Sequence, residues 1–291
     1  MANRGTQRMA AHKAVEEAVY RHVTRIRDAA VRMLGANPDD EAVHDFRVGM
    51  RRLRTVLRAS RNLYGKKRVD KLSKRLAEFG KATNALRDAE VLLETLQQIE
   101  LSVHMRAQTA AWLDRRGPRD ERLRRIAMVY VRGSQLVGDL RRVERLIRRG
   151  PKTKLSFADF AATELATAQR RVEKRLPVAR DDMEAMHRLR IQFKQLRYTA
   201  AMLAGFAREA GQSESRKQTR FAAIANDAAE LQRVLGLLHD IDVAATAVRR
   251  ARSLDPEDKT ELTGSLAHHQ RRIAREVLRR LEELAPTTLG R

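Results

Sequence analysis

Two segments of the chain carry one histidine and three cationic side chains at identical spacing. In the first segment, 43–57, these residues are His44, Arg47, Arg51 and Arg54. In the second segment, 186–200, they are His187, Arg190, Lys194 and Arg197. Both fit the pattern H-x-x-R-x-x-x-[R/K]-x-x-R, with a constant offset of 187 − 44 = 143 positions. Solvation of a surface does not require matching positions in two copies, so we interpret the pair as an internal duplication.

The spacing places the cations of each segment on one face of a helix. At about 100° per residue, the histidine and the three cations of the first segment fall within an arc of roughly 80°. The apolar residues fall on another face, and they are Phe46, Met50, Leu53 and Leu57 in the first segment and Leu189, Phe193, Leu196 and Ala200 in the second. Arginine provides planar, permanently charged donors that match phosphate oxygens in pairs. Such a row of fixed cations is suited to a polyanion.

The composition also indicates a polyanionic partner. The 291 residues carry a formal charge of +23, which makes the compact chain repel itself unless a polyanion binds. Nucleic acid, an anionic membrane surface and inorganic polyphosphate all meet this requirement. The absence of cysteine excludes disulfides, thiol catalysis and cysteine-ligated metal sites. No segment approaches the ~18 apolar residues of a membrane span, and the first residues lack an apolar signal core, so we expect a cytoplasmic protein.

A second element recurs beyond each basic segment. LRDAEV at 86–91 matches LHDIDV at 238–243, with an offset of 240 − 88 = 152 that pairs Lys81 with Arg233. We interpret Asp88 and Asp240 as N-caps of the helices that follow or as local charge partners of the starts of those helices, in preference to a catalytic role. Lys74 lies seven residues before Lys81 and shares its predicted face.

Low aromatic content, few glycines and prolines and helical periodicity together predict an all-α fold. The predicted helices span about 8–34, 39–64, 67–86, 88–112 and 119–147 in the first half, and 157–176, 182–210, 215–238, 240–253 and 256–284 in the second. Gly150 and Pro151 mark the boundary between a first half, 8–150, and a second half, 151–291, after a mobile arm at 1–7. Short connections between antiparallel helices predict two up-and-down four-helix bundles, which together make one domain.

These motifs resemble the CHAD domain, the conserved histidine α-helical domain, over about residues 10–285. The resemblance implies two four-helix bundles related by a pseudo-twofold axis, with inorganic polyphosphate bound in a basic central channel between them. Carried over by position, the polyphosphate-binding residues would be His44, Arg47, Arg51, Arg54, Lys81, His187, Arg190, Lys194, Arg197 and Arg233. A wider candidate set adds Arg58, Lys74, Arg87 and His239. Arg58 and Arg61 continue the first stripe where the second copy has Ala201 and Ala204, so we do not expect a strictly symmetric site.

Two other functions fit parts of the sequence. Nucleic acid could bind the basic surface, although single-strand binders use aromatic stacking platforms and most aromatic residues here occupy core-spaced positions. A metal-dependent phosphohydrolase is suggested by His44-Asp45 and His239-Asp240, but the cations around His44 would repel a divalent metal. A triphosphate tunnel domain, a frequent companion in the CHAD family, does not fit in the remaining residues. We therefore expect a binding protein without catalytic residues, metal or cofactor, and association with polyphosphate granules is left open.

Overall fold

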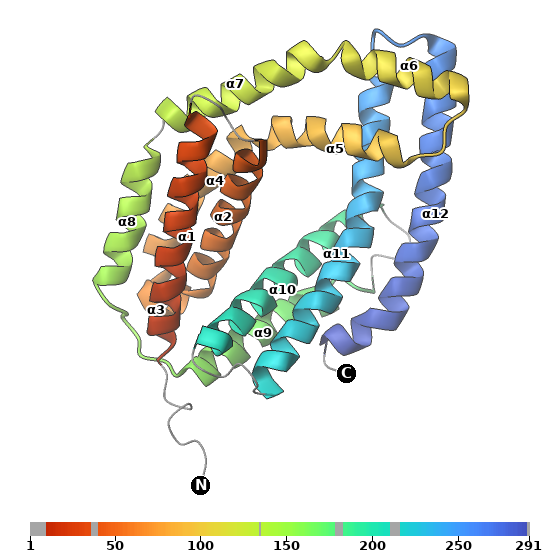
Figure 1. The fold of residues 1–291 in the computed structure, drawn as a ribbon. Helices are drawn as coiled ribbons and strands as arrows, with labels where there is room; N and C mark the ends of the chain where they lie inside the picture. Colours follow the sequence, from red (N-terminus) through yellow and green to blue (C-terminus); the bar gives the residue numbers. More distant parts are fainter. Residues whose placement is uncertain (1–9, 36–39, 134, 178–182, 210–215, 290–291) are drawn as a thin grey trace.

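The computed structural model describes residues 10–35, 40–133, 135–177, 183–209 and 216–289 (Figure 1). Every named element within these ranges is an α-helix, which confirms the predicted all-α class. The predicted arm at 1–7 lies outside the described residues. No helix in the described part of the chain is long and apolar enough to cross a membrane.

Four helices of the first half pack in a closed ring. They are α1 (Ala11–Leu34), α2 (Asp40–Ala59), α4 (Lys66–Ala82) and α8 (Leu136–Arg148), each in contact with the next and α8 in contact with α1. The short helix α3 (Arg61–Tyr64) leads from α2 into α4, and Gly65 takes a φ of 92° at this turn, which favours glycine. Helix α1 buries Val15, Val19, Val23 and Ile26, whose helical spacing forms one apolar face.

Four helices of the second half form a comparable ring. They are α9 (Phe157–Glu173), α10 (Met183–Glu209), α11 (Arg216–Arg249) and α12 (Pro256–Leu289). Helix α10 also contacts α1 and α2, and α1 contacts α9. One continuous hydrophobic core therefore contains buried residues of both halves, from Ala11 to Leu289.

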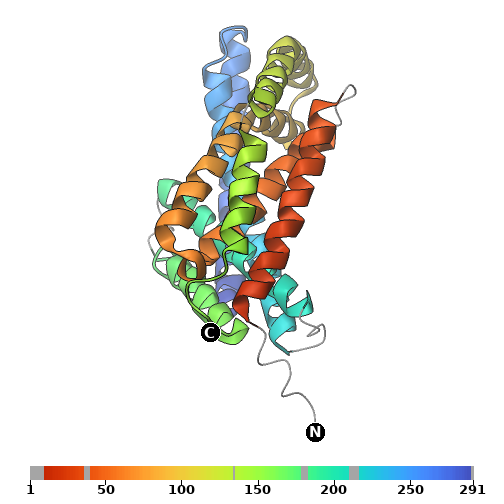
Figure 2. The same ribbon diagram turned by 90° about the vertical axis from the view of Figure 1, so that its left-hand side faces the viewer.

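Three further helices extend from the first bundle toward the second. They are α5 (Asn84–Gln98), α6 (Val103–Asp114) and α7 (Gly117–Gly133). Helix α5 runs across to α11, and α6 lies against the upper parts of α11 and α12 (Figures 1 and 2). A second hydrophobic core forms there, with Leu92, Leu96 and Trp112 packed against Ile241 and Val248.

Several predicted boundaries are wrong. The segment 88–112 forms two helices, α5 and α6, and 119–147 forms α7 and α8. In place of the two predicted helices 215–238 and 240–253 there is one continuous helix, α11 (Arg216–Arg249), in which Leu238, Ile241 and Ala244 keep a helical burial pattern. Asp240 therefore lies inside α11 and Asp88 inside α5, so neither is an N-cap.

Candidate functional site

A cationic cavity of about 550 Å³ lies where α2 and α10 face α4 and α9. Its cationic lining residues come from α2, α3, α4, α9 and α10 and are Arg47, Arg51, Arg54, Arg58, Arg61, Lys81, Arg171 and Lys194. Among the described residues that line it, Glu164 is the one carboxylate and Tyr198 the one aromatic residue. We call this space the front cavity.

Helix α2 supplies half of these cations because its two faces differ in character. Phe46, Met50 and Leu53 are buried in the core, which turns the arginine stripe toward α10. Burial, followed by the charge of neighbouring arginines, lowers the pKa of both Arg54 and Arg58. The Nε atom of Arg54 is buried and finds no hydrogen-bond partner among the described residues. These guanidinium groups are held close together without enough carboxylates to balance their charge.

Two of the α2 arginines are fixed by neutral acceptors. Arg47 Nη1 donates to Thr83 Oγ1 at 2.5 Å, and its Nη2 donates to Asn84 Oδ1 at 3.4 Å. Arg51 Nη1 donates to the hydroxyl oxygen of Tyr198 at 2.7 Å, which links α2 directly to α10. Since these acceptors carry no charge, they orient the guanidinium groups without neutralising them.

Lys194 and Glu164 have shifted acidities inside the front cavity. Burial, together with Arg51, Arg190 and other cations, lowers the pKa of Lys194 to about 8. Burial raises the pKa of Glu164 to about 7, although the charges of Arg171 and Arg61 act in the opposite direction. Both groups therefore titrate close to neutral pH, and both would respond to an anion in the cavity.

The three cationic residues of the second motif copy lie in three different places. Lys194 lines the front cavity, whereas Arg197 lines a separate cavity of about 350 Å³ beside α1 and donates to Gln232 Oε1 at 3.2 Å. We call this second space, between α1, α2 and α10, the rear cavity. Arg190 is directed toward α11, where a Cβ added to Gly236 would stand 3.8 Å from its Nε. That Nε atom is buried without a hydrogen-bond partner in the described structure.

The histidines of the motif do not line the front cavity. His44 is exposed on α2. His187 faces His239 in a smaller cavity of about 270 Å³, with their Nδ1 atoms 3.2 Å apart. Burial and nearby cations lower the pKa of both imidazoles, that of His239 to about 4. No group of three or more potential metal ligands occurs in the described part of the chain.

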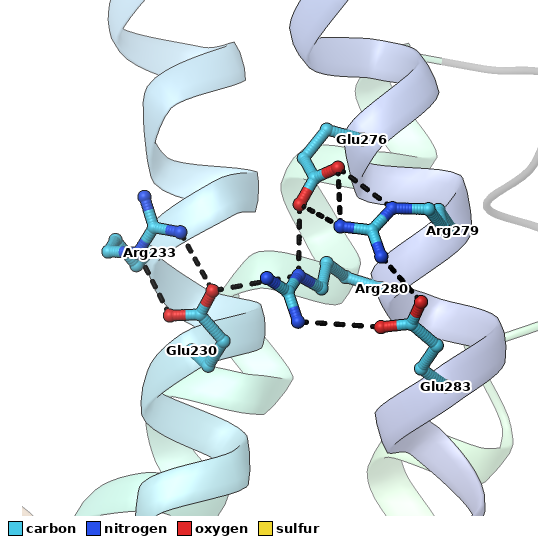
Figure 3. A network of polar contacts seen from close by, with 6 residues as sticks. All are labelled: Glu230, Arg233, Glu276, Arg279, Arg280 and Glu283. Atoms are coloured by element: carbon cyan, nitrogen blue, oxygen red, sulfur yellow. Dashed lines mark hydrogen bonds and ion pairs between the residues drawn. The ribbon is translucent and has the colours of Figure 1, made fainter.

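The candidates from the second repeated element are paired with carboxylates. Lys81 reaches the rim of the front cavity but its Nζ contacts Glu78 Oε1 at 2.9 Å. Arg233 belongs to a network of alternating charges between α11 and α12 and contacts Glu230 at 2.7 Å (Figure 3). Arg87 pairs with Glu90 and Glu94. Lys74 is exposed and lines neither the front nor the rear cavity.

Three important residues of the front cavity were not predicted. They are Glu164 and Arg171 of α9 and Tyr198 of α10. Glu164, Thr167 and Arg171 occur at positions i, i+3 and i+7, so the sequence does place them on one face of a helix. Nothing in the sequence indicated that this face of α9 turns toward α2. The predicted set therefore contributes five of its members to the front cavity, namely Arg47, Arg51, Arg54, Lys81 and Lys194, and Arg58 joins them from the wider set.

Comparisons with known proteins agree with this architecture. The family model of the CHAD domain matches residues 14–249. The crystal structure of the CHAD domain from the plant Ricinus communis is similar, with 19% identity, a TM-score of 0.73 and coverage of 96% of this chain and 92% of that chain. PptA from Streptomyces chartreusis gives 17% identity, a TM-score of 0.67 and coverage of 95% and 99%, respectively. Curated protein sequences give no match. Since the family model covers most of the sequence, the chain belongs to the CHAD domain family.

Proposed function

We propose that this protein binds inorganic polyphosphate in the front cavity. The observation that carries the proposal is the convergence of eight cationic side chains on a space that contains a single described carboxylate. The buried Nε atom of Arg54 has no hydrogen-bond partner within the described structure, so this donor is open to an acceptor from a ligand. An anion with many phosphate groups would supply the missing acceptors along its whole length.

The shape and lining of the cavity favour polyphosphate over nucleic acid. A chain of phosphates carries charge along a flexible line and needs no surface for bases. Single-stranded nucleic acid gains about 1–3 kcal/mol per base from stacking on aromatic side chains. Tyr198, the one aromatic residue among the described lining residues, is held by Arg51 and flanked by Arg197, with both guanidinium groups within 5.6 Å of its ring centroid. A base would therefore have to compete with two guanidinium groups for this ring.

Binding would relieve repulsion that the folded protein already contains. Two like charges about 5 Å apart repel by roughly 3 kcal/mol at an effective dielectric constant of 20. Phosphate oxygens between them convert this repulsion into attraction, and each charge-assisted hydrogen bond contributes about 1.5–3 kcal/mol. Lys194 would then regain its full charge, because a bound polyanion raises its pKa again. The protein exerts no chemistry on the chain in this proposal and acts as a receptor.

The decisive experiment removes charge from the front cavity without changing side-chain length greatly. We expect R51Q/R54Q/R58Q/K194Q to weaken polyphosphate binding at least about a hundredfold, because four charged contacts are lost. The matched control R122Q/R141Q/R145Q/R148Q removes the same charge from exposed arginines on α7 and α8. Isothermal titration calorimetry at several salt concentrations gives both affinity and salt dependence. Equal losses in the two variants would show that binding reflects overall charge and not this cavity.

Competition between polymers separates polyphosphate from nucleic acid. Polyphosphate should displace labelled single-stranded DNA of equal total charge, whereas DNA should displace polyphosphate poorly. Affinity should also rise with polyphosphate length and then level off once the cavity is filled, since further units make no new contacts. Stronger binding of DNA at equal charge would favour the basic surface as a nucleic-acid site.

A further inference from the structure

One face of α7 carries exposed apolar side chains in two adjacent turns. Ala127 and Val131 of this helix are buried in the first hydrophobic core, where α7 contacts α1, α4 and α5. On the other face, Ile126, Val129 and Tyr130 are 52%, 68% and 41% exposed. Of the eight most exposed large apolar side chains in the described structure, four lie within residues 126–137. Apolar groups gathered in this way, and not scattered singly, are typical of an interaction surface.

The spacing of these residues is the spacing with which one helix packs against another. Ile126, Val129, Tyr130 and Gly133 occupy positions i, i+3, i+4 and i+7, and we call this row the α7 seam. A Cβ added to Gly133 would meet nothing within 4 Å, so the end of the seam is open. In Figure 1, α7 runs along the outer edge of the molecule. A partner helix can therefore approach the seam from outside.

A groove of about 510 Å³ adjoins the seam where α7 meets α4 and α8. Phe79 and Tyr130 form its aromatic wall, with ring centroids 5.9 Å apart in an edge-to-face arrangement, and Val129 lines it beside them. On the opposite wall, the nearly buried carboxylate of Asp139 accepts from Arg75 Nε at 2.6 Å. Contacts between the elements therefore hold both walls in place. The groove has room for a large apolar side chain from a partner.

The same face of α7 becomes cationic toward the start of the helix. Arg122 and Arg119 lie four and seven residues before Ile126, which places them one and two turns away on the seam side. Both are exposed, and neither side chain forms an ion pair with a described residue. Glu121, the exposed carboxylate of α7, lies on the flank and contacts Arg125 at 3.7 Å. The exposed face therefore has an apolar end beside the groove and a cationic end without counter-charge.

We propose that the α7 seam and its groove are a docking site for an amphipathic helix of a protein partner, apolar at one end and acidic at the other. An apolar side chain of the partner enters the groove, and its carboxylates pair with Arg119 and Arg122. The site lies outside the front and rear cavities, so it does not depend on polyphosphate binding.

Two other occupants fit this surface less well. A second copy of the chain offers no carboxylate on its own seam to meet Arg119 and Arg122, and two chains of charge +23 repel each other. An anionic membrane would place its headgroups over Glu78 and Asp139, which line the groove. A flat lipid surface also leaves a groove of this depth unfilled, whereas a side chain of a helix can enter it.

The first test uses a synthetic helix of about 16 residues, ~24 Å long, which matches the length of the exposed face. It carries leucines spaced i, i+3, i+4 and i+7 in one half and glutamates in the other, with a fluorescent label for anisotropy titration. We expect I126E/V129E to weaken its binding at least about thirtyfold, because two apolar contacts become buried charges. The matched control L93E/V103E changes two exposed apolar residues of α5 and α6 and should keep the affinity. Equal affinities of the two variants overturn the proposal.

A charge exchange tests the cationic end and the other occupants. R119E/R122E should bind the acidic helix about tenfold more weakly, and should bind a helix with lysines in place of the glutamates more tightly than the unaltered protein does. The control R271E/R275E makes the same change on exposed positions of α12 and should have little effect on either helix. Equal effects of the two variants would assign binding to overall charge and overturn the proposal. A dimer, or binding to phosphatidylglycerol vesicles, that I126E/V129E abolishes while neither helix binds would also overturn it.

Discussion

The two halves of the molecule use matching segments in different ways. At an offset of 152, Thr83 of the first half matches Leu235 of the second. The chain breaks at Thr83 into α4 and α5, whereas α11 continues through Leu235 as one helix of 34 residues. Thr83 is fully buried, and its hydroxyl donates to backbone carbonyls one turn back and accepts from Arg47. A local hydrogen bond of this kind competes with helix continuation, which the apolar Leu235 does not do.

This difference shows how a repeated sequence can serve two structural tasks. The break directs α5 out of the first bundle, so that Leu92 and Leu96 reach the continuous helix α11. The continuous helix provides the surface against which the arm packs. The break also provides the acceptor for Arg47 at the edge of the front cavity. One half therefore bends to meet the other, and the front cavity depends on that bend.

The largest effect is expected in the second hydrophobic core. Trp112 is almost fully buried there, so W112A should destabilise the protein by about 3–5 kcal/mol through loss of packing. Hydrogen exchange should report the loss mainly in α5, α6 and the upper parts of α11 and α12. Polyphosphate affinity at a temperature where the variant is folded should change little, since the front cavity belongs to the other core. W112F is the control that retains most of the volume.

A smaller effect is expected when Thr83, at the break between α4 and α5, is replaced by leucine, the residue at the matching position of α11. T83L removes the acceptor of Arg47 Nη1 and should cost about 2 kcal/mol of unfolding free energy, as for other lost hydrogen bonds to charged groups. T83S keeps the hydroxyl and should lose less than half as much. Chemical denaturation measures both variants. A T83L protein as stable as the unaltered one would show that the Arg47 contact does not hold the break.

The close contact of α1 with α2 involves a glycine of α2, and the second half has a different residue at the matching position. A Cβ at Gly49 would stand 2.8 Å from Ile26 Cγ1, whereas Gln192 occupies the matching position in α10, since 192 − 49 = 143. G49A should therefore destabilise by about 1 kcal/mol, because overpacking outweighs the gain in helix propensity. G264A, where an added Cβ meets nothing within 4 Å, should stabilise by up to about 1 kcal/mol. Thermal unfolding in which G49A is the more stable variant would contradict the close approach.

The smallest effect is the pH dependence of polyphosphate affinity that Lys194 causes. Lys194 occupies the position that matches Arg51 of the first half. Its pKa of about 8 in the free protein rises when a polyanion binds, so binding takes up a proton above pH 8. Affinity should fall as pH increases beyond 8, by at most about tenfold per unit. K194R stays charged and should lose this dependence. Calorimetry in buffers with different ionisation enthalpies measures the proton uptake.

Glu164 should give a separate step at lower pH. Its carboxyl group has a pKa of about 7 and repels a polyanion once ionised, so affinity should fall as pH rises through 7. E164Q should remove this step and leave the step of Lys194 unchanged. If both variants keep the full pH profile of the unaltered protein, neither group contacts the bound chain.

The sequence predicts the positions of the cations of the first motif copy better than the positions of those of the second copy. Arg47, Arg51 and Arg54 lie together because one amphipathic helix determines their direction, and its apolar positions are clear in the sequence. Arg190 and Arg197 separate because their surroundings come from α11 and α1, which lie outside the repeated motif. Asp240 was wrongly predicted as an N-cap because residue type alone does not distinguish an aspartate at the start of a helix from one inside a helix.

The network on α11 and α12 has a consequence for the rate of encounter with a polyanion. Three glutamates and three arginines alternate there, and Arg280 connects Glu276 and Glu283 of its own helix to Glu230 (Figure 3). This face carries no net charge from the six residues, although the whole chain carries +23. The excess positive charge, and with it the field that attracts a polyanion, therefore comes from the rest of the chain, which includes the cations of both cavities. A diffusing polyanion is oriented by this field before contact, so association should be fast at low salt and should slow steeply as ions screen the field.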